Sequence, residues 1–283
     1  MKNFGLFVNR SKDVDGKITD AIRTYLLEHD AKCFVYDMPA SYEERQKNKA
    51  SLPEDTDCLI TLGGDGTLIQ AARDMYLRDI PVMGVNLGHL GFLAEIDKDR
   101  VFPSLDRLLK DDYEIEERML IQGVILHDGK EVMKDIALND IVLNRVGHMH
   151  VIDFDVYVNG AYLMNYRADG MIFSTATGST AYNLSAGGPL VVPTAQLMVM
   201  TPICAHALNA RCVIIDAFST IEMRIKPSTS ASSKEGCVLA YDGNHIVDLN
   251  EDDVIRVSRF ERPTRLIKLS QTSFIELLRK KMQ

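Results

Sequence analysis

Cys58-Leu59-Ile60-Thr61-Leu62, followed directly by Gly63-Gly64-Asp65-Gly66-Thr67, decides how the first half of the chain is interpreted. The first five residues form a short apolar run of the kind that makes a buried strand. Beyond the glycines, apolar residues at 68, 69, 72, 75 and 76 have the spacing of a helix. The stretch therefore predicts a strand, a glycine-rich turn and a helix in direct succession.

The glycine-rich turn suits a phosphate ligand. Glycine lets the backbone approach a ligand closely, and the start of a helix offers unpaired N–H groups. Asp65 does not suit a phosphate, because the two negative groups repel each other. Such an acid needs another task, such as holding a metal or accepting a proton from an attacking hydroxyl. The alternative is a plain tight turn in which Asp65 caps the helix, and turn chemistry alone leaves both interpretations open.

Two familiar nucleotide-binding motifs are excluded. The third glycine of G-x-G-x-x-G would fall at Ile69, and the chain contains no G-x-x-x-x-G-K-[ST].

Composition narrows the class of protein. The chain has 283 residues, 46% hydrophobic and 25% charged, which are ordinary globular values. A net charge of −8 argues against a non-specific nucleic-acid binder. The five cysteines form no C-x-x-C pair and lie mostly in apolar settings, so we expect reduced, buried thiols. The longest apolar region, 190–208, is interrupted by prolines and a histidine and predicts no membrane span. With no signal-peptide pattern at the N-terminus, we expect a cytoplasmic enzyme.

Strands and helices alternate through residues 1–117, which predicts a Rossmann-like α/β domain with a parallel sheet. In such sheets ligands bind at the carboxyl ends of the strands. The glycine-rich turns at 63–66 and 88–91 both follow strands and belong at that edge. The expected strands are 4–9, 31–36, 58–62 and 80–85, and the expected helices are 17–28, 68–77 and 101–109.

Residues 118–259 change character and predict an all-β domain of sandwich type. Asn159-Gly160 is a strong hairpin signal, and Asp242-Gly243-Asn244 marks a second turn. Residues 228–233 are serine-rich and predict a surface loop. The tail at 273–282 has helical spacing, and we expect residues 260–283 to pack back on the first domain. The expected strands are 119–126, 136–143, 151–158, 162–166, 221–225, 237–241, 245–249 and 254–258.

Two polar stretches of this second half are candidate sites. Asn139-Asp140 falls inside the apolar run 136–143, where adjacent side chains point to opposite faces of a strand, so at least one faces inward or toward a ligand. The alternative for this pair is a bulge or a strand end. Residues 169–188 combine a strand with small hydroxylated residues, glycines and Tyr182, which could stack on a base. A helix starting at about Thr180 would aim its amides at the same ligand.

Taken together, these stretches resemble the bacterial NAD kinases, within the wider group that includes diacylglycerol and sphingosine kinases. The first motif alone is shared with 6-phosphofructokinases and lipid kinases, whereas 169–185 with the Asn139 pair is specific to NAD kinases. The resemblance implies transfer of the ATP γ-phosphoryl group to the 2′-hydroxyl of the adenosine ribose of NAD. The matching segments are 63–67, 86–93, 139–140, 169–185, 187–189 and 201–203 with His206.

The resemblance also assigns roles to residues. Asp65 is the implied general base, the glycines around it cradle the ATP phosphates, and Gly66 lies against the dinucleotide. Asn139, Asp140 and Asp169 contact NAD, while residues 180–185 line the adenosine pocket with Tyr182 near the base. The implied ligand-binding residues are Gly63, Gly64, Gly66, Thr67, Phe92, Asn139, Asp140, His150, Arg167, Asp169, Thr180, Ala181, Tyr182, Asn183, Leu184, Ser185 and Asn244.

The implied cofactor is a divalent ion, Mg²⁺, with ATP or polyphosphate as donor, and the implied assembly is a homodimer or homotetramer whose subunits share the NAD pocket. No nucleic acid or membrane partner is expected. Three positions depart from the family pattern. Asp140 stands where glutamate is usual, Gln70 where many members have arginine, and Ala176 where proline is common. If that arginine holds the triphosphate, Arg167 or basic residues of another subunit are the candidates to replace it.

Two other functions fit parts of the pattern. A lipid or sugar kinase could share the glycine loop, and an acceptor panel would distinguish it. A non-catalytic dinucleotide-binding regulator would bind NAD yet release no ADP. Asp65 argues against the regulator, because a carboxylate in a phosphate loop hinders binding unless the chemistry uses it.

Overall fold

The computed structural model describes residues 1–39, 44, 52–88, 91–147, 151–207, 209–226, 236–250 and 252–282. Within it the chain forms two compact units. Unit 1 comprises residues 1–117 and 264–283, and unit 2 comprises residues 118–263. The chain therefore leaves unit 1, builds all of unit 2 and then returns to unit 1. The serine-rich stretch 228–233 and His150 lie outside the described residues.

Unit 1 is built on one sheet with the strand order β2-β1-β3-β4-β19-β6, and β5 pairs with β4 in addition. The pairs β1–β2, β1–β3, β3–β4 and β4–β19 are all parallel. Its strands are β1 (Asn3–Val8), β2 (Lys32–Asp37), β3 (Cys58–Gly63), β4 (Val82–Asn86), β5 (Ile96–Asp97), β6 (Glu114–Arg118) and β19 (Thr264–Lys268). Its helices are α1 (Lys17–Glu28), α3 (Asp65–Met75), η1 (Lys98–Arg100), α4 (Val101–Leu109) and α6 (Phe274–Met282).

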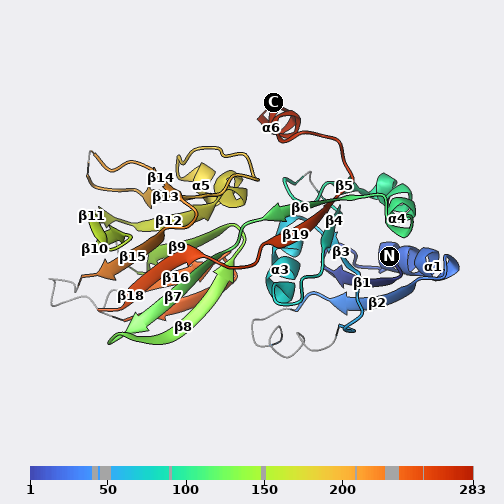
Figure 1. Cartoon of the computed structure of the whole chain (residues 1–283), viewed down its shortest axis with the longest axis horizontal. Coiled ribbons are helices and arrows are strands. Elements are labelled where there is room, and N and C mark those ends of the chain that lie inside the picture. The colour runs from blue at the N-terminus through green and yellow to red at the C-terminus, as the bar shows by residue number, and fades with distance from the viewer. Residues whose placement is uncertain are drawn as a thin grey trace. The chain divides into compact units, whose positions relative to one another are not determined.

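Helices cover both faces of this sheet. Figure 1 shows α3 on one side of the strands and α1 with α4 on the other. The apolar faces of α1 and α4 explain their position, because Ile22, Leu26 and Leu105 are fully buried in one cluster with strand residues. Strand β3 is buried along its whole length, as expected for the middle of a parallel sheet. This burial holds the glycine-rich turn, which follows β3, in a fixed position.

Unit 2 contains two six-stranded sheets, with the orders β11-β10-β15-β18-β7-β8 and β14-β13-β12-β9-β16-β17. Every strand pair recorded in them is antiparallel. The strands are β7 (Ile121–His127), β8 (Lys130–Ala137), β9 (Asp140–Arg145), β10 (Ile152–Val158), β11 (Ala161–Ala168), β12 (Gly170–Thr175), β13 (Leu197–Ile203), β14 (Val213–Asp216), β15 (Thr220–Ile225), β16 (Cys237–Tyr241), β17 (His245–Leu249) and β18 (Val254–Arg259). The short helices η2 (Thr177–Thr180) and α5 (Tyr182–Ser185) follow β12.

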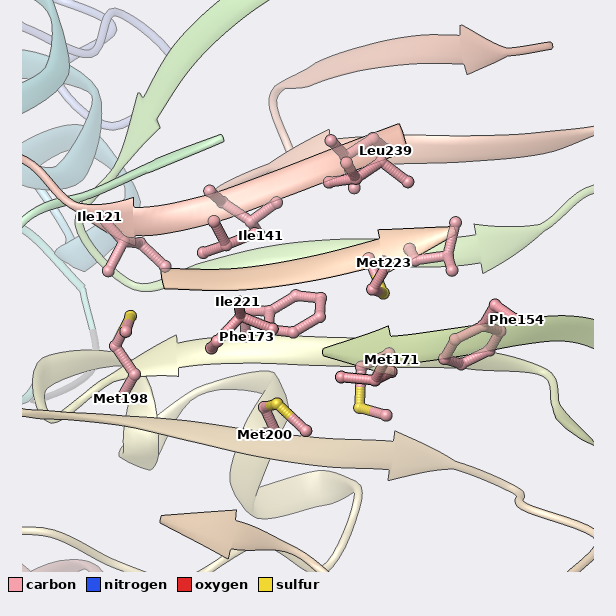
Figure 2. Close-up of a cluster of buried hydrophobic side chains, with 14 of the residues drawn as sticks. Ile121, Ile141, Phe154, Met171, Phe173, Met198, Met200, Ile221, Met223 and Leu239 are labelled. Atoms are coloured by element: carbon pink, nitrogen blue, oxygen red, sulfur yellow. The ribbon is translucent and has the colours of Figure 1, made fainter. Parts of the chain in front are cut away.

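The inner faces of the two sheets form one core. Figure 2 shows Phe154 and Met223 of the first sheet among Met171, Phe173 and Met200 of the second. All five side chains are completely buried. Methionine is flexible and fills irregular gaps, which suits it to the space between two twisted sheets. The core thus explains why the inward positions of these strands are apolar.

The fold class predicted from the sequence, α/β followed by a β-sandwich, is confirmed. Helices α1 and α4 have the predicted bounds. Asn159 and Gly160 have φ of 51° and 80°, as a tight hairpin turn of the predicted type requires. In the part of the chain that is described, no helix is long and apolar enough to cross a membrane.

Three local predictions are wrong. The strand expected at 136–143 is two strands, β8 and β9, because the amides of residues 138–140 bond to a side chain rather than to a neighbouring strand. The helix expected from about Thr180 is only the four-residue α5, which starts at Tyr182 and ends before Gly187, a residue with positive φ. The cysteines are all free, but only Cys58 and Cys237 are buried, and Cys204 is exposed.

Candidate functional site

In unit 1, two loops meet where β3 and β4 end. Gly63 and Asn86 are register neighbours, and the Leu87 amide donates a hydrogen bond to the Gly63 carbonyl at 2.7 Å. The glycine-rich turn follows β3, and the loop through residues 91–94 follows β4. The carboxyl edge of the parallel sheet therefore brings the two turns together, as the order of strands and helices predicts.

Asp65 joins these two loops. Its Oδ2 accepts a hydrogen bond from the Phe92 amide at 2.6 Å, and its Oδ1 accepts from the Leu93 and Ala94 amides at 3.1 and 2.9 Å. Asp65 is the first residue of α3, whose cap position is Gly64, so its side chain does not cap the helix. The helix-cap alternative is thus replaced by a carboxylate that main-chain donors hold from a separate loop.

The glycines around Asp65 differ in what a side chain at their positions would contact. A Cβ on Gly63 would lie 2.1 Å from Thr67 Oγ1, and a Cβ on Gly91 would lie 1.8 Å from Asp65 Oδ1. The packing of the protein itself therefore excludes side chains at both positions. A Cβ on Gly64 or Gly66 would meet nothing within 4 Å. Open space beside these two glycines leaves room for a ligand to approach the backbone.

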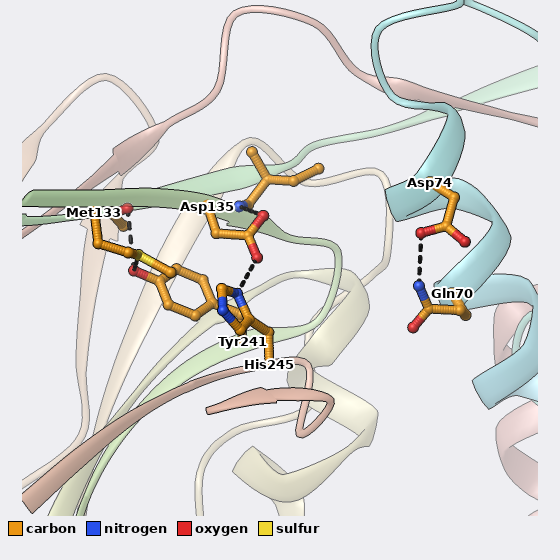
Figure 3. A network of polar contacts seen from close by, with 8 residues as sticks. Gln70, Asp74, Met133, Asp135, Tyr241 and His245 are labelled. Atoms are coloured by element: carbon orange, nitrogen blue, oxygen red, sulfur yellow. Dashed lines mark hydrogen bonds and ion pairs between the residues drawn. The ribbon is translucent and has the colours of Figure 1, made fainter. Parts of the chain in front are cut away.

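Two further predicted positions of unit 1 have protein partners. The Phe92 ring lies 6.3 Å from the Phe274 ring of α6, and Lys281 Nζ of the same helix lies 4.2 Å from its centroid. Gln70, which stands where the family often has arginine, is buried, and its Nε2 donates to Asp74 Oδ1 at 2.7 Å (Figure 3). Gln70 therefore does not replace an arginine as a phosphate-binding group.

In unit 2, Asn139 and Asp140 lie at a tight turn between β8 and β9. The amides of Leu138, Asn139 and Asp140 donate to the Asp242 carboxylate at 2.9, 2.7 and 3.1 Å. Thr175 holds the other side of this turn, because its amide and its hydroxyl donate to the carbonyls of Asn139 and Leu138 at 2.9 and 2.6 Å. The Asn139-Asp140 pair therefore lies at a strand end, as one interpretation predicts, and contact of either side chain with a ligand stays a prediction.

Asp140 is 6% exposed. Its burial, and secondly the negative charge of Asp242, raise the pKa of the Asp140 carboxyl from 3.8 to about 7. Perturbed ionisation of this kind is typical of functional sites, although structural networks also produce it.

The segment 177–185 continues from the Thr175 side of that turn. Gly178 lies so close to it that a Cβ there would be 2.1 Å from the Asn139 carbonyl oxygen. Tyr182 is 43% exposed and is therefore open to a stacking partner. Asn183, in contrast, is fully buried and donates both amide hydrogens within the protein, to the Ser179 and Pro189 carbonyls. Its Oδ1 accepts from the Thr201 hydroxyl at 2.6 Å, so the Asn183 side chain fixes this segment from inside the protein.

Asp169 lies just before β12, at the end of that strand away from the Asn139-Asp140 turn, and Arg167 lies in β11, a strand of the other sheet of unit 2. Asp169 forms an ion pair with Arg145, whose Nε lies 2.8 Å from Asp169 Oδ1. Near the other end of β12, Ser174 is the register neighbour of Asp140. Five residues at about 3.4 Å each separate the two ends by about 17 Å. A single chain therefore does not place Asp169 beside Asp140.

The structure gathers only some of the predicted residues. Asp65 lies with Gly63, Gly64, Gly66 and Phe92 in unit 1, whereas Asn139 and Asp140 lie with segment 177–185 and the exposed Asn244 in unit 2. Sequence reasoning missed the contact of Gly91 with Asp65, the three amides around Asp65, and Thr175 and Asp242 as members of these groups. Asp242 had a visible signal, an Asp-Gly pair between two strands, but that signal indicates only a turn.

The side chains able to bind a metal can be compared with the Mg²⁺ ion that the resemblance implies. In the described ranges, no group of three or more His, Cys, Asp or Glu side chains could enclose a metal. Mg²⁺ in kinases is usually held by one or two carboxylates together with the phosphates of the substrate. Asp65 already accepts three amide hydrogen bonds, so an ion beside the glycine-rich turn would be held mainly by the phosphates of the substrate.

An α/β unit with an acid in a glycine-rich turn, joined to a β-sandwich with a buried Asp140 beside Asn139, is the arrangement expected of a two-domain phosphotransferase. The model of the ATP-NAD kinase N-terminal domain matches residues 4–113, and that of the C-terminal domain matches residues 138–269. The chain belongs to the ATP-NAD kinase family.

Curated relatives agree with this assignment. An NAD kinase of Lachnospira eligens is 43% identical over the full length of both chains, and one of Lachnoclostridium phytofermentans is 39% identical over 99% of each. Among solved structures, the yeast NADH kinase complexed with NADH has a TM-score of 0.83 at 24% identity, covering 100% of this chain and 87% of the other. An Archaeoglobus fulgidus NAD kinase in complex with ATP has a TM-score of 0.77 at 23% identity, covering 98% of each chain. These two structures support the fold.

Proposed function

We propose that the protein transfers the γ-phosphoryl group of ATP to the 2′-hydroxyl of the adenosine ribose of NAD, which produces NADP. The observation that carries this proposal is the hydrogen bonding of Asp65. A carboxylate can accept about four hydrogen bonds. Three come from the amides of residues 92–94, two of them on Oδ1 and one on Oδ2. The remaining acceptor position, on Oδ2, suits the hydroxyl that attacks the phosphorus.

In this mechanism Asp65 is the general base. Oδ2 receives the proton of the ribose hydroxyl while that oxygen attacks the γ-phosphorus of ATP and ADP leaves. The three amides keep the carboxylate in position, so little reorganisation accompanies the step. The open space beside Gly64 and Gly66 leaves room for the phosphates near the first turn of α3, whose N–H groups favour anions. A bound Mg²⁺ supplies charge neutralisation on the phosphate oxygens.

The residues of unit 2 bind NAD in this proposal. Asn139, Asp140 and segment 180–185 contact the dinucleotide, and the exposed ring of Tyr182 stacks near the adenine. Asp169 is about 17 Å of strand away from Asp140, and Arg167 lies on β11 in the other sheet, which favours the use of both by a second copy of the chain. A homodimer or homotetramer with shared NAD pockets accommodates both groups. Five free cysteines suit the reducing cytoplasm.

The test replaces the base and keeps the shape of its side chain. Purified parent protein with NAD, ATP and Mg²⁺ should form NADP, read out by an NADP-specific dehydrogenase. Asp65→Asn should lower turnover by about 10²- to 10⁴-fold, the usual contribution of a general base. Asp74→Asn is the matched control in the same helix and should stay within about twofold. Replacement of ATP by polyphosphate in the same assay identifies the donor.

Other outcomes would overturn the proposal. Phosphate on a sugar or lipid but not on NAD would make the protein a different kinase. NAD binding by calorimetry without release of ADP would make it a regulator. Parent-level turnover by a folded Asp65→Asn variant would remove Asp65 from the role of base.

A further inference from the structure

Asp242 lies in the three-residue loop between β16 and β17, two positions before Asn244. Its φ is 48° and that of Gly243 is 65°, so both residues adopt the left-handed conformation. Aspartate, asparagine and glycine tolerate this conformation better than other residues. The loop thereby turns the Asp242 side chain toward the start of β9, where its carboxylate accepts three hydrogen bonds.

These three bonds replace part of a sheet ladder. Leu138 and Asn139 separate β8 from β9, and the amides of 138–140 donate to Asp242 Oδ1 and Oδ2. The Asp242 amide in turn donates to the Asp140 carbonyl at 3.0 Å. A carboxylate that gathers successive amides holds a tight turn firmly, because hydrogen bonds to a charged acceptor are roughly twice as strong as neutral ones.

The opposite side of the turn is held by neutral groups. Thr175 donates from its amide and its hydroxyl to the two carbonyls of the turn, and its Oγ1 accepts from the Gly178 amide at 3.0 Å. Of Asp242 and Thr175, whose hydrogen bonds hold the turn at Asn139 and Asp140, Asp242 is therefore the one with a charged side chain. It is also the nearby negative group that acts on the buried Asp140 carboxyl.

From this geometry we propose that Asp242 is a positioning residue for NAD binding: it fixes the Asn139-Asp140 turn so that both side chains face the dinucleotide. The proposal rests on the proposed function, in which this pair contacts NAD. Asp242 itself need not touch the substrate. Its effect is confined to the acceptor nucleotide, because the donor phosphates are assigned to the glycine-rich turn of unit 1.

Asp242→Asn is the informative change. Asparagine keeps the size of the side chain and tolerates a positive φ, but its NH₂ group faces at least one of the three backbone N–H donors in either orientation. The turn must then shift. We expect kcat/KM for NAD to fall about 10- to 100-fold, the effect of a displacement of roughly 1 Å in a positioned site. The KM for ATP should stay within about twofold.

Asp253→Asn is the matched control. Asp253 is another buried turn aspartate of unit 2, and it accepts a hydrogen bond from the Asn250 amide and pairs with His127. Its replacement should lower thermal stability while the KM for NAD stays within about twofold. If Asp242→Asn yields too little folded protein, Asp242→Gly preserves the turn conformation and removes the carboxylate.

Calorimetry of NAD binding to each variant separates this inference from the proposed function. A parent protein that makes no NADP overturns the proposed function, and weaker NAD binding by Asp242→Asn would then still support the role of Asp242. Parent-like NAD binding and kcat/KM in Asp242→Asn would overturn the inference. Equal loss toward NAD and ATP would overturn it as well, since that pattern indicates general damage to the fold.

Discussion

Gly91 is the position at which a single methyl group should disable the protein. A Cβ built on Gly91 lies 1.8 Å from Asp65 Oδ1 and 2.7 Å from Oδ2, whereas real Cβ atoms essentially never approach other atoms within 3.0 Å. In Gly91→Ala the methyl group and the carboxylate must therefore move apart by roughly 1 Å, and the carboxylate cannot keep its present hydrogen bonds to residues 92–94.

The expected magnitude follows from this displacement. Misplacing a catalytic group by 1 Å costs about 10²-fold in rate, which corresponds to about 2.7 kcal/mol of transition-state stabilisation. Hydrogen bonds to a charged group contribute about 1.5–3 kcal/mol each, so weakening the three bonds of Asp65 can supply that amount. We expect Gly91→Ala to lower kcat by about 100-fold or more while calorimetry still detects NAD binding.

Gly88→Ala is the control in the same loop. A Cβ on Gly88 would have Asn86 Oδ1 as its nearest neighbour, at 3.9 Å, which is an ordinary contact. This variant should keep kcat within about threefold of the parent value. A folded Gly91→Ala protein with the kcat of Gly88→Ala would refute the argument, because it would show that the position of the Asp65 carboxylate does not limit turnover.

Two further predictions concern unit 2. The raised pKa of Asp140, about 7 against 3.8 in the unfolded chain, means that the folded protein binds more protons between these values, so the free energy of unfolding should fall as pH rises from about 4 to 7. Asp140→Asn should flatten this dependence in urea unfolding measured across that range, and an unchanged slope would contradict it. The fully buried Tyr241 donates to the Gly123 carbonyl at 3.1 Å (Figure 3 shows its ring), so Tyr241→Phe should cost about 1 kcal/mol in urea unfolding. Tyr162→Phe, on an exposed ring, should cost less than 0.5 kcal/mol, and equal costs would argue against this hydrogen bond.

The sequence predicted unit 1 well because its signals are local. Apolar runs, helical spacing and glycine-rich turns each occupy a few consecutive residues, and the rule for parallel sheets then places both turns at one edge. Glycine patterning drew attention to residues 88–91, but it could not show that Gly91 faces Asp65. That contact joins loops about 27 residues apart, and no short pattern encodes it.

Unit 2 was harder, since its site depends on side chains that replace main-chain hydrogen bonds. The run 136–143 is apolar throughout except at Asn139 and Asp140, so it resembles one strand. The break between β8 and β9 exists because Asp242, about 100 residues later, takes the amides that a neighbouring strand would otherwise use. Likewise, nothing in the periodicity separates Asp169 from Asp140. Their distance follows from the register of β9 against β12.

The path of the chain makes unit 2 an insertion within unit 1, and this has a consequence for synthesis on the ribosome. Strands β6 and β19, where the chain leaves and re-enters, are neighbours in one sheet. The first sheet thus cannot be completed until every residue of unit 2 has emerged. Closing an unstructured loop as long as unit 2 would cost on the order of 4 kcal/mol in chain entropy. A sandwich that folds early removes much of that cost by bringing its two ends together. We therefore expect unit 2, the middle of the chain, to fold before the sheet of unit 1 is complete.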